Sequence, residues 1–381
     1  MAKKILIFST AYLPLVGGAE IAVKELTDRL TGFEFNLITA RLKKNLVRQE
    51  KIGRVMIYRV GSGRDFDKFL LPILGLIKAI RLNRKNNYML SWAIMASFGA
   101  LAAWLFKKIN RRTPYLLTLQ EGDSPEHIYS RAKWLGPYYK KMFTQADFIT
   151  AISHYLKDFA LKQGTMASIE IVPNGVDVKK FKVESLRFQV AELKNKLSIK
   201  DNEKVIITVS RLVEKNGVGD IIEAMRYLSA SVKLLIIGEG ELEASCRLQI
   251  VNCKLGDRVI MLGAIKNEEV PRYLALADVF VRPSISEGQG IAFLEAMASG
   301  VPVVATPVGG IVDFLRDGET GLFCEVNNPK SIAEKVKILL DNKELAETIK
   351  INAKELVVKN YDWNLLAEKM KTIFEKLLVG H

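Results

Sequence analysis

Two carboxylates eight residues apart flank a glycine-rich turn in the last third of the chain. They are Glu287 and Glu295, within Ser286-Glu-Gly-Gln-Gly-Ile-Ala-Phe-Leu-Glu295. The apolar run before the turn predicts a buried strand, and the residues after Gly290 have helical periodicity. Such a junction presents free backbone N–H groups and the positive end of a helix dipole, which suit a phosphate or diphosphate. Because carboxylates accept hydrogen bonds from hydroxyl groups, diphosphate and hydroxyls together indicate a nucleotide sugar.

Two cations follow another predicted strand. Arg211 and Lys215 lie four residues apart in Ser210-Arg-Leu-Val-Glu-Lys215, which we expect at the rim of the crevice that holds Glu287. Two positive charges there would neutralise a diphosphate leaving group as a glycosidic bond breaks. Taken alone, the same segment also fits an ordinary helix start with solvated charges.

A glycine pair lies between the first predicted strand and the first predicted helix. Gly17 and Gly18 occur in Leu13-Pro-Leu-Val-Gly-Gly-Ala-Glu20. Glycine permits a close approach of the backbone to a ligand. The run is not a complete GxGxxG fingerprint, so by itself it is a weak indication of dinucleotide binding.

Short apolar strands alternate with helical segments along the whole chain, which predicts an α/β protein with parallel sheets. The expected strands form two series: Lys4–Ser9, Phe35–Thr39, Val55–Val60, Tyr115–Gln120, Phe148–Ile152 and Ile169–Val172, then Val205–Ser210, Lys233–Gly238, Val259–Leu262, Val279–Val281 and Val301–Ala305. We therefore expect two facing Rossmann-like domains with a ligand crevice between them at the carboxyl ends of their strands. The expected bounds are 1–185 and 186–361, with 362–381 as a helix that returns to the first domain.

Composition narrows the class of partner. The 381 residues are 49% hydrophobic and 26% charged, as in a globular protein. Residues 1–200 hold 34 Lys/Arg against 16 Asp/Glu, whereas residues 201–381 hold 22 against 26. The basic first half favours an acidic acceptor or anionic lipid headgroups, and we find no nucleic-acid-binding motif. Three scattered histidines do not form a metal cluster, and three cysteines without motif spacing indicate a cytoplasmic protein.

One apolar segment is long enough to span a bilayer. Tyr88–Phe106 holds 19 residues without a charge between basic flanks. We favour its division into a strand, Tyr88–Trp92, and a helix, Ala93–Phe106, because the alternation needs both. Leu70–Ile80 is also apolar and lies between basic residues. The two segments favour a peripheral position at the inner face of the cell membrane.

Together these motifs resemble family-4 retaining glycosyltransferases of the B-type, two-Rossmann-domain fold. The resemblance covers essentially the whole chain. It rests on Gly17-Gly-Ala-Glu20, Pro173-Asn-Gly-Val-Asp177, Ser210–Lys215, Gly238-Glu-Gly240 and, most specifically, Glu287–Ala305.

The resemblance implies a role for each motif. Glu287 and the amides of Gly288, Gln289, Gly290 and Ile291 would hold the donor sugar and its diphosphate, and Glu295 would bind the ribose. Arg211 and Lys215 would stabilise the diphosphate. Gly17 and Gly18 would let the N-terminal loop approach the donor, and the nucleobase would rest near Gly263-Ala-Ile265. Such enzymes use a nucleotide-diphosphate sugar as co-substrate, need no metal or cofactor, and let the leaving phosphate accept the acceptor's proton.

The chain departs from the family pattern at two positions. Asn216 stands where the family places a lysine, and Gln120 stands where many members have a histidine. Gln120 can donate a hydrogen bond to a sugar hydroxyl but cannot act as a base. Glu121 or Asp123 would then orient the acceptor, and His127 is either an acceptor-side residue or a plain helix residue.

The sequence thus predicts transfer of a hexosyl unit from a nucleotide-diphosphate sugar to a hydroxyl acceptor. We expect that acceptor to be a lipid-linked glycan or another precursor of a cell-surface polysaccharide. Two alternatives remain open. One is a nucleotide-sugar epimerase of the same fold, and the other is a nucleotide-sugar-binding protein without catalytic activity.

Overall fold

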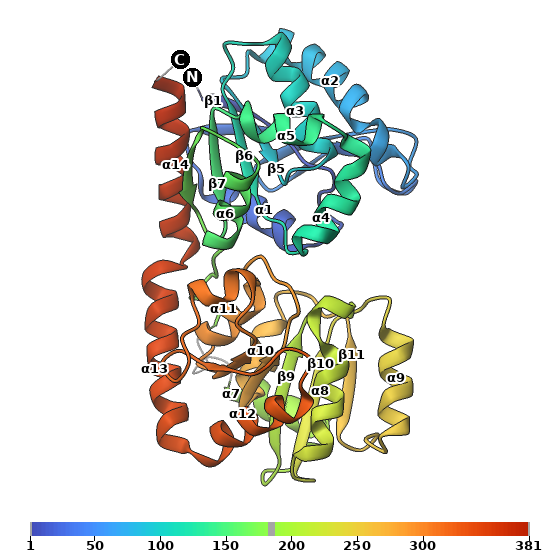
Figure 1. Ribbon diagram of the computed structural model, residues 1–381, viewed down its shortest axis with the longest axis vertical. Helices are drawn as coiled ribbons and strands as arrows, with labels where there is room; N and C mark the ends of the chain where they lie inside the picture. Colours follow the sequence, from blue (N-terminus) through green and yellow to red (C-terminus); the bar gives the residue numbers. More distant parts are fainter. Residues whose placement is uncertain (1, 182–186, 380–381) are drawn as a thin grey trace. The chain divides into compact units, whose positions relative to one another are not determined.

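The computed structural model describes residues 2–181 and 187–379 and divides the chain into two compact units (Figure 1). One unit holds the chain up to Asn174 and again from Trp363; the other is Gly175–Asp362. The domain boundary that we expected between residues 185 and 186 lies outside the described residues.

An eight-stranded sheet forms the centre of the first unit, in the order β3-β4-β2-β1-β5-β6-β7-β8. Its strands are β1 (Lys3–Phe8), β2 (Phe33–Ala40), β3 (Gln49–Ile52), β4 (Val55–Val60), β5 (Leu90–Ile94), β6 (Tyr115–Leu119), β7 (Phe148–Ala151) and β8 (Ser168–Ile171). All neighbours pair in parallel except β3, which is antiparallel to β4. The sequence analysis missed β3, because this partly exposed edge strand has no apolar run.

Helices cover both faces of this sheet: α1 (Gly18–Arg29), α2 (Asp67–Asn86), α3 (Phe98–Ile109), α4 (Pro125–Ala132), α5 (Tyr138–Thr144), α6 (His154–Lys162) and α14 (Trp363–Val379). The last helix belongs to this unit because its apolar face packs on the sheet. Phe374 lies edge-on to Phe33 and Trp92, with ring centroids 5.5 and 5.3 Å apart. The expected return of the final helix to the first domain is confirmed (Figure 1).

The apolar segment Tyr88–Phe106 forms β5 and most of α3, as the alternation of strands and helices required. The strand begins two residues later than predicted, at Leu90, and its five residues are all buried. Within residues 2–181 and 187–379, none of the helices combines the length and the apolar character that a bilayer span requires.

The second unit is built on a six-stranded parallel sheet in the order β11-β10-β9-β12-β13-β14. Its strands are β9 (Lys204–Val209), β10 (Val232–Ile237), β11 (Val259–Gly263), β12 (Val279–Arg282), β13 (Val303–Ala305) and β14 (Leu322–Phe323). Its helices are α7 (Arg187–Lys196), α8 (Val218–Ala224), α9 (Glu243–Asn252), α10 (Val270–Leu276), α11 (Ile291–Ala298), α12 (Pro329–Asp341) and α13 (Lys343–Asn360). The prediction of an α/β protein with two Rossmann-like units is confirmed.

Among the parallel strands, the strand order reverses once in each sheet. In the first it reverses between β1 and β5, and in the second between β9 and β12. Loops that leave neighbouring strands in opposite directions open a crevice at such a point, and ligands of open α/β sheets bind there. The switch point of the second sheet therefore directs attention to the residues that follow β9 and β12.

Candidate active site

The loops after β9 and β12 are joined at the switch point of the second sheet. Arg211 follows β9, and Lys215 lies in a short 3₁₀ helix, Glu214–Asn216. The Ile285 N–H, in the loop after β12, donates to the carbonyl of Lys215 at 2.7 Å. The structure thus brings the segment with the two predicted cations to the segment that holds Glu287.

Arg282, the last residue of β12, links these two loops. Arg282 is only 9% exposed, and its guanidinium forms an ion pair with Glu287 and donates to Asn216 Oδ1 at 3.0 Å. The Cζ atom of this guanidinium also lies 5.2 Å from the centre of the Phe293 ring. A buried charge is costly unless it is paired, so Arg282 and Glu287 fix one another. The sequence analysis ended the expected strand at Val281 and gave Arg282 no role; a charge at the end of an apolar run was the available signal.

Glu287 is held by its main chain as well as by its carboxylate. Its Oε1 accepts from the Gly288 N–H at 3.0 Å, and its carbonyl accepts from the Gly310 N–H at 3.1 Å. Gly309 has φ +55°, and a Cβ there would lie 1.9 Å from the Glu287 carbonyl oxygen. Only glycine fits this close approach. The sequence analysis missed this glycine pair, which follows β13 as Gly17-Gly18 follows β1.

Asn216 has a structural role at the position where the resemblance places a lysine. It is buried, and its Nδ2 donates to the Arg211 carbonyl at 2.7 Å while its Oδ1 accepts from Arg282. The next residue, Gly217, has φ +65°, and a Cβ there would lie 2.3 Å from the Pro283 carbonyl oxygen. The Arg211 side chain is exposed and that of Lys215 is half-buried. The cation that pairs with Glu287 is Arg282, the last residue of β12.

The other predicted donor-side segments lie along the same edge of the sheet. Gly238, after β10, has φ +133°, and a Cβ there would lie 1.9 Å from the Ser210 carbonyl oxygen. The Gly238 N–H donates to the Gly263 carbonyl at 2.8 Å, which joins the ends of β10 and β11. Ile265, predicted to lie near the nucleobase, is half-buried two residues after β11.

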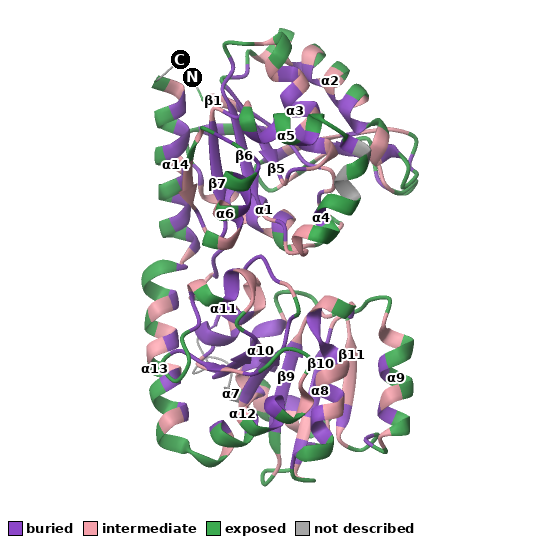
Figure 2. Cartoon of the chain, in the orientation of Figure 1, coloured by how far each residue is buried: buried purple, intermediate pink, exposed green. Residues whose placement is uncertain are grey.

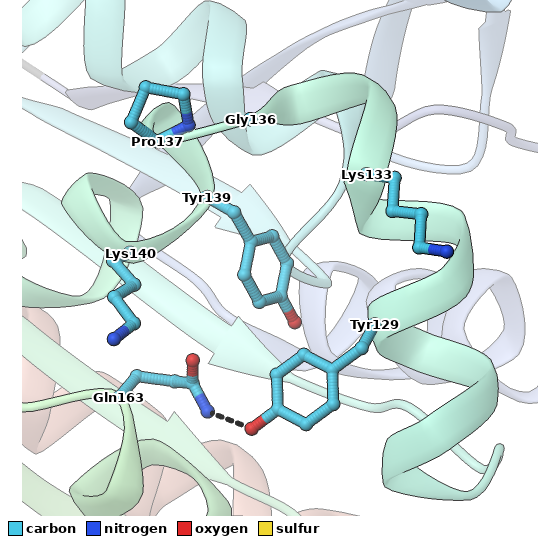
Figure 3. Close-up of a pocket in the computed structure, with 7 residues that line it drawn as sticks. All are labelled: Tyr129, Lys133, Gly136, Pro137, Tyr139, Lys140 and Gln163. Atoms are coloured by element: carbon cyan, nitrogen blue, oxygen red, sulfur yellow. Dashed lines mark hydrogen bonds between the residues drawn. The ribbon is translucent and has the colours of Figure 1, made fainter.

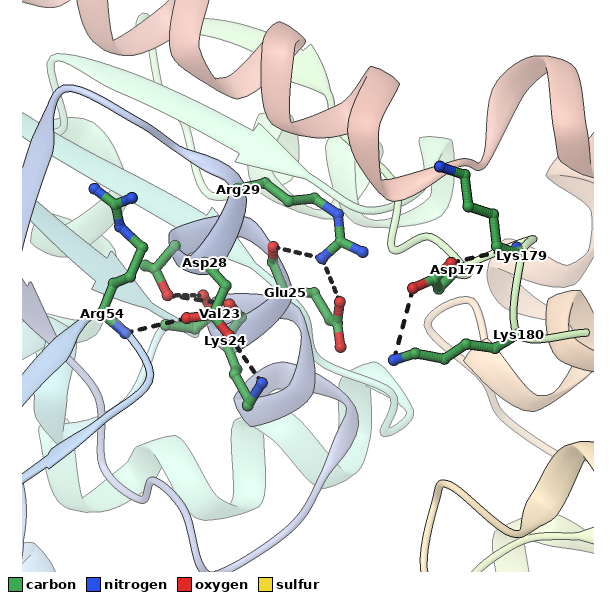
Figure 4. Close-up of polar contacts among 10 residues, drawn as sticks. Val23, Lys24, Glu25, Asp28, Arg29, Arg54, Asp177, Lys179 and Lys180 are labelled. Carbon is green, nitrogen blue, oxygen red and sulfur yellow. Dashed lines mark hydrogen bonds and ion pairs between the residues drawn. The ribbon is translucent and has the colours of Figure 1, made fainter.

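Glu295 is the fifth residue of α11, and its carboxyl group is poorly solvated. Burial raises the pKa of Glu295 to about 7, and the charge of Lys180 acts against that rise. Lys180 itself pairs with Asp177 at 3.6 Å (Figure 4). A carboxylate that gives up hydration in the free protein gains from hydroxyl donors on a ligand. This fits the expected contact with ribose hydroxyls, which stays a prediction.

In the first unit, Gly17 and Gly18 lie at the start of α1, as predicted. A Cβ on Gly17 would lie 2.5 Å from Glu20 Oε2. The loop before them is held by Arg59, a buried residue of β4 that donates to the carbonyl of Leu13 at 2.6 Å. The sequence analysis did not single out Arg59, whose role depends on the path of the loop.

The predicted acceptor-side residues follow β6 and differ in environment. Gln120 Oε1 is buried and has no hydrogen-bond partner among the described residues. Glu121 is buried and uses both carboxylate oxygens on the main chain, accepting from Ala96 N–H at 2.5 Å and Gln120 N–H at 2.9 Å. Burial raises the pKa of Glu121, and these main-chain donors oppose the rise. Asp123 is half-buried, and His127 is exposed in the first turn of α4.

A hollow of about 280 Å³ opens in the first unit between α4, α5 and α6 (Figure 3). It is lined by Tyr129, Lys133, Gly136, Pro137, Tyr139, Lys140 and Gln163. Gln163 Nε2 donates to the Tyr129 hydroxyl at 2.8 Å. The lining holds none of the predicted site residues and no carboxylate. Across the part of the chain that the structure describes, no group of three His, Cys, Asp or Glu side chains could hold a metal ion.

Comparison with known proteins gives matches along nearly the whole chain. The model of Glycosyltransferase Family 4 matches residues 16–180, and that of Glycosyl transferases group 1 matches residues 189–356. The N-acetyl-alpha-D-glucosaminyl L-malate synthase of Bacillus anthracis is 28% identical over 98% of each chain. The alpha-monoglucosyldiacylglycerol synthase of Acholeplasma laidlawii is 27% identical over 98% of this chain and 97% of that one.

Solved structures with the same fold are also found. The structure of HepE from Anabaena in complex with UDP and glucose has a TM-score of 0.82 and 19% identity, and it covers 98% of this chain and 100% of its own. At this level of identity the likeness establishes the fold.

Proposed function

The chain belongs to the family-4, group 1 glycosyltransferases, and we propose that it transfers a hexosyl unit from a nucleotide-diphosphate sugar to a hydroxyl acceptor with the anomeric configuration retained. The observation that carries this proposal is the network at the switch point of the second sheet, in which Arg282 joins Glu287 to Asn216. It fixes the Glu287 carboxylate and the backbone of the loop that carries Arg211 and Lys215 before a ligand arrives, and stabilisation of a developing charge requires such preorganisation.

The donor is proposed to bind along the carboxyl edge of the second sheet. Glu287 and the amides that follow it, Gly288 to Ile291, hold the sugar and the diphosphate at the start of α11. Glu295 accepts hydrogen bonds from the ribose hydroxyls. Arg211 and Lys215 neutralise the diphosphate as it leaves. UDP in the HepE structure supports a nucleoside diphosphate as the leaving group.

The transfer step exchanges one bond for another at the anomeric carbon. The bond from this carbon to the diphosphate oxygen breaks, and a bond to the acceptor oxygen forms on the same face of the sugar. The proton of the acceptor hydroxyl passes to the leaving phosphate. Cations that stabilise this phosphate lower the barrier more than they stabilise the bound donor, because its charge grows as the bond breaks. We propose that no metal is needed, since Arg211 and Lys215 supply the positive charge.

The acceptor is proposed to be a lipid-linked glycan or another polysaccharide precursor, reached from the cytoplasmic face of the membrane. The name of the Acholeplasma relative contains a diacylglycerol, which supports a lipid acceptor. The charge of residues 1–200, with 34 basic against 16 acidic side chains, supports an anionic partner. The buried, unpartnered Gln120 Oε1 is an acceptor group that a hydroxyl could satisfy.

Calorimetric titration with UDP, GDP, ADP and their hexose conjugates, in buffer containing EDTA, tests the donor site. We expect saturable binding of one nucleotide series, weakened in Glu295→Ala and unchanged in Glu334→Ala, an exposed glutamate on α12 of the same unit. Failure of all three series to bind would contradict the proposal. Incubation of the bound nucleotide sugar without acceptor then separates the activities, because an epimerase converts the sugar and a transferase does not.

A further inference from the structure

Helix α2 leaves an apolar stripe exposed on the first unit. Phe66, Leu70, Ile73 and Ile77 are 62, 38, 62 and 43% exposed. Their spacing of four, three and four residues places them on one face of the helix. Figure 2 shows exposed residues recurring along α2. Exposed apolar side chains scattered singly are ordinary, but a continuous stripe over three turns marks a surface that meets an apolar partner.

The opposite face of α2 is already packed. Leu71, Pro72, Gly75, Ala79 and Leu82 are buried. A Cβ on Gly75 would lie 3.3 Å from the Ala102 side chain, so α2 and α3 are closely packed there. The helix therefore needs no further partner to be stable, and the exposed stripe is not left over from an incomplete core.

Basic side chains continue the same face toward the end of the helix. Arg81, Arg84 and Lys85 are exposed and follow Ile77 at helical spacing. Burial, with Arg81 and Lys85 nearby, lowers the pKa of Lys78, as expected where positive charges gather. This combination of apolar and basic side chains suits a partner that has an apolar interior and an anionic surface.

The acidic groups near the stripe are already engaged. Asp67 is buried and accepts from the Gly63 and Arg64 N–H groups at 2.6 and 3.0 Å. Asp65 pairs with Lys68 at 2.5 Å. Neither carboxylate offsets the charge at the basic end of α2, which therefore attracts an anionic partner.

The end of α3 adds to the basic part of this surface. Asn83 Nδ2 of α2 donates to Asn110 Oδ1, just after α3, at 3.1 Å, so the two helix ends lie together. Lys108, Arg111 and Arg112 are exposed there. Lys107 is different, because its ammonium group pairs with Asp147 at 2.8 Å. The basic surface thus spans two helices.

We propose that α2 lies flat on an anionic lipid bilayer, with its apolar stripe among the acyl chains and the basic ends of α2 and α3 on the phosphate headgroups. A second copy of the chain fits this face less well. Two-fold pairing through it would bring basic residues into a shared interface that has no free acidic side chain on α2 to receive them.

The orientation also suits the proposed acceptor, and in this respect the inference rests on the proposed function. The stripe begins at Phe66, just before α2, and the Phe69 ring packs on Phe98 at 5.0 Å. Phe98 opens α3, and the next N–H, of Gly99, donates to Thr10 Oγ1 at 3.2 Å, just beyond β1. The apolar half of the surface is therefore at the carboxyl edge of the first sheet, the edge that also holds Gln120. A lipid-linked acceptor would reach this edge without leaving the bilayer.

Co-flotation with phosphatidylcholine vesicles, with and without phosphatidylglycerol, tests the inference on the full chain. We expect binding only with phosphatidylglycerol and about a tenfold loss in the double variant Ile73→Glu, Ile77→Glu. The matched control is Ile351→Glu, Val358→Glu on α13, where both side chains are similarly exposed, at 52 and 47%. The control should bind as the unmodified protein does, and thermal unfolding should show that both variants are folded. If the glutamate variant does not fold, Ile73→Ser, Ile77→Ser replaces it.

Three results would overturn the inference: no vesicle binding by the unmodified protein, equal binding by the folded stripe variant, or equal loss in the α13 control. A dimer that the stripe variant converts to a monomer, with no vesicle binding, would assign the face to a second copy instead. Nucleotide titration without vesicles is run on the same proteins. The proposed donor residues lie on the other unit. If the unmodified protein binds vesicles but no nucleotide, the result would therefore count against the proposed function and not against the membrane inference.

Discussion

The carboxyl edges of the two sheets use charged side chains in different ways. On the second sheet, Arg282 binds both Glu287 and Asn216 and thereby fixes two loops. On the first sheet, the carboxylate oxygens of the buried Glu121 accept hydrogen bonds from main-chain N–H groups. In contrast, Gln120 Oε1 has no hydrogen-bond partner among the described residues. One edge holds a preorganised charge arrangement, and the other holds a rigid frame with an unsatisfied acceptor group.

The difference follows from what each edge would bind. A diphosphate demands charges that are fixed before it binds, and Gly309, Gly217 and Gly238 each let one loop of this edge lie so close to another that a Cβ is excluded. A hydroxyl acceptor demands only a few hydrogen bonds. Sequence motifs are therefore dense around the second edge and sparse around the first.

The largest expected effect is at Glu287. We expect Glu287→Gln to lower kcat about 1000-fold or more, because the amide keeps the shape of the carboxylate but removes its charge from the reacting sugar. The buried Arg282 then loses its charged partner, so we also expect a lower unfolding midpoint, and the rates are compared at a temperature at which thermal unfolding shows the variant to be folded. Initial-rate assays with Glu334→Gln as control make the measurement. A rate within threefold of normal would remove Glu287 from the catalytic machinery.

The next effect tests the exposed cation of the same edge. We expect Arg211→Ala to cost about 3 kcal/mol of transition-state stabilisation, roughly 100-fold in kcat/KM. Because the side chain is exposed and its carbonyl, not its guanidinium, holds Asn216, folding should be unaffected. Arg316→Ala, at an exposed arginine of the same unit, is the control. Equal losses in the two variants would mean that the effect comes from net charge.

The sequence predicts the second edge better than the first for a physical reason. Apolar runs fix the strands, and the spacing from Arg211 to Lys215 and from Glu287 to Glu295 lies within single loops and helices. Arg282 and Gly309 escaped prediction because their partners are set by how loops return to one another. Strand β3 escaped because an exposed edge needs no apolar face.

A smaller, pH-dependent effect is expected at Glu295, whose pKa burial raises to about 7. The ionised carboxylate accepts hydrogen bonds from two ribose hydroxyls more strongly than the neutral acid does. The Kd of a nucleotide sugar should therefore rise as pH falls through 7, by up to about tenfold per pH unit. Nucleotide sugars suit this titration because their diphosphate does not ionise in this range. Glu295→Gln should bind more weakly with a flat profile, and an unchanged pH dependence in that variant would assign the titration to another group.

The smallest catalytic effect is expected at Glu121, and it decides whether the first edge is a frame or part of the reaction. Glu121→Gln turns an NH₂ group toward a main-chain N–H of Ala96 or Gln120, so one buried donor loses its acceptor. We expect a loss of about 1–3 kcal/mol in the free energy of unfolding, while kcat and the KM for the acceptor change less than about threefold. Asp123→Asn is the comparison, because that carboxylate is half-buried in the same loop. If Glu121→Gln instead raises the acceptor KM strongly without loss of stability, Glu121 orients the acceptor. The contrast between the two edges would then fail, because both would hold a carboxylate that acts on a substrate.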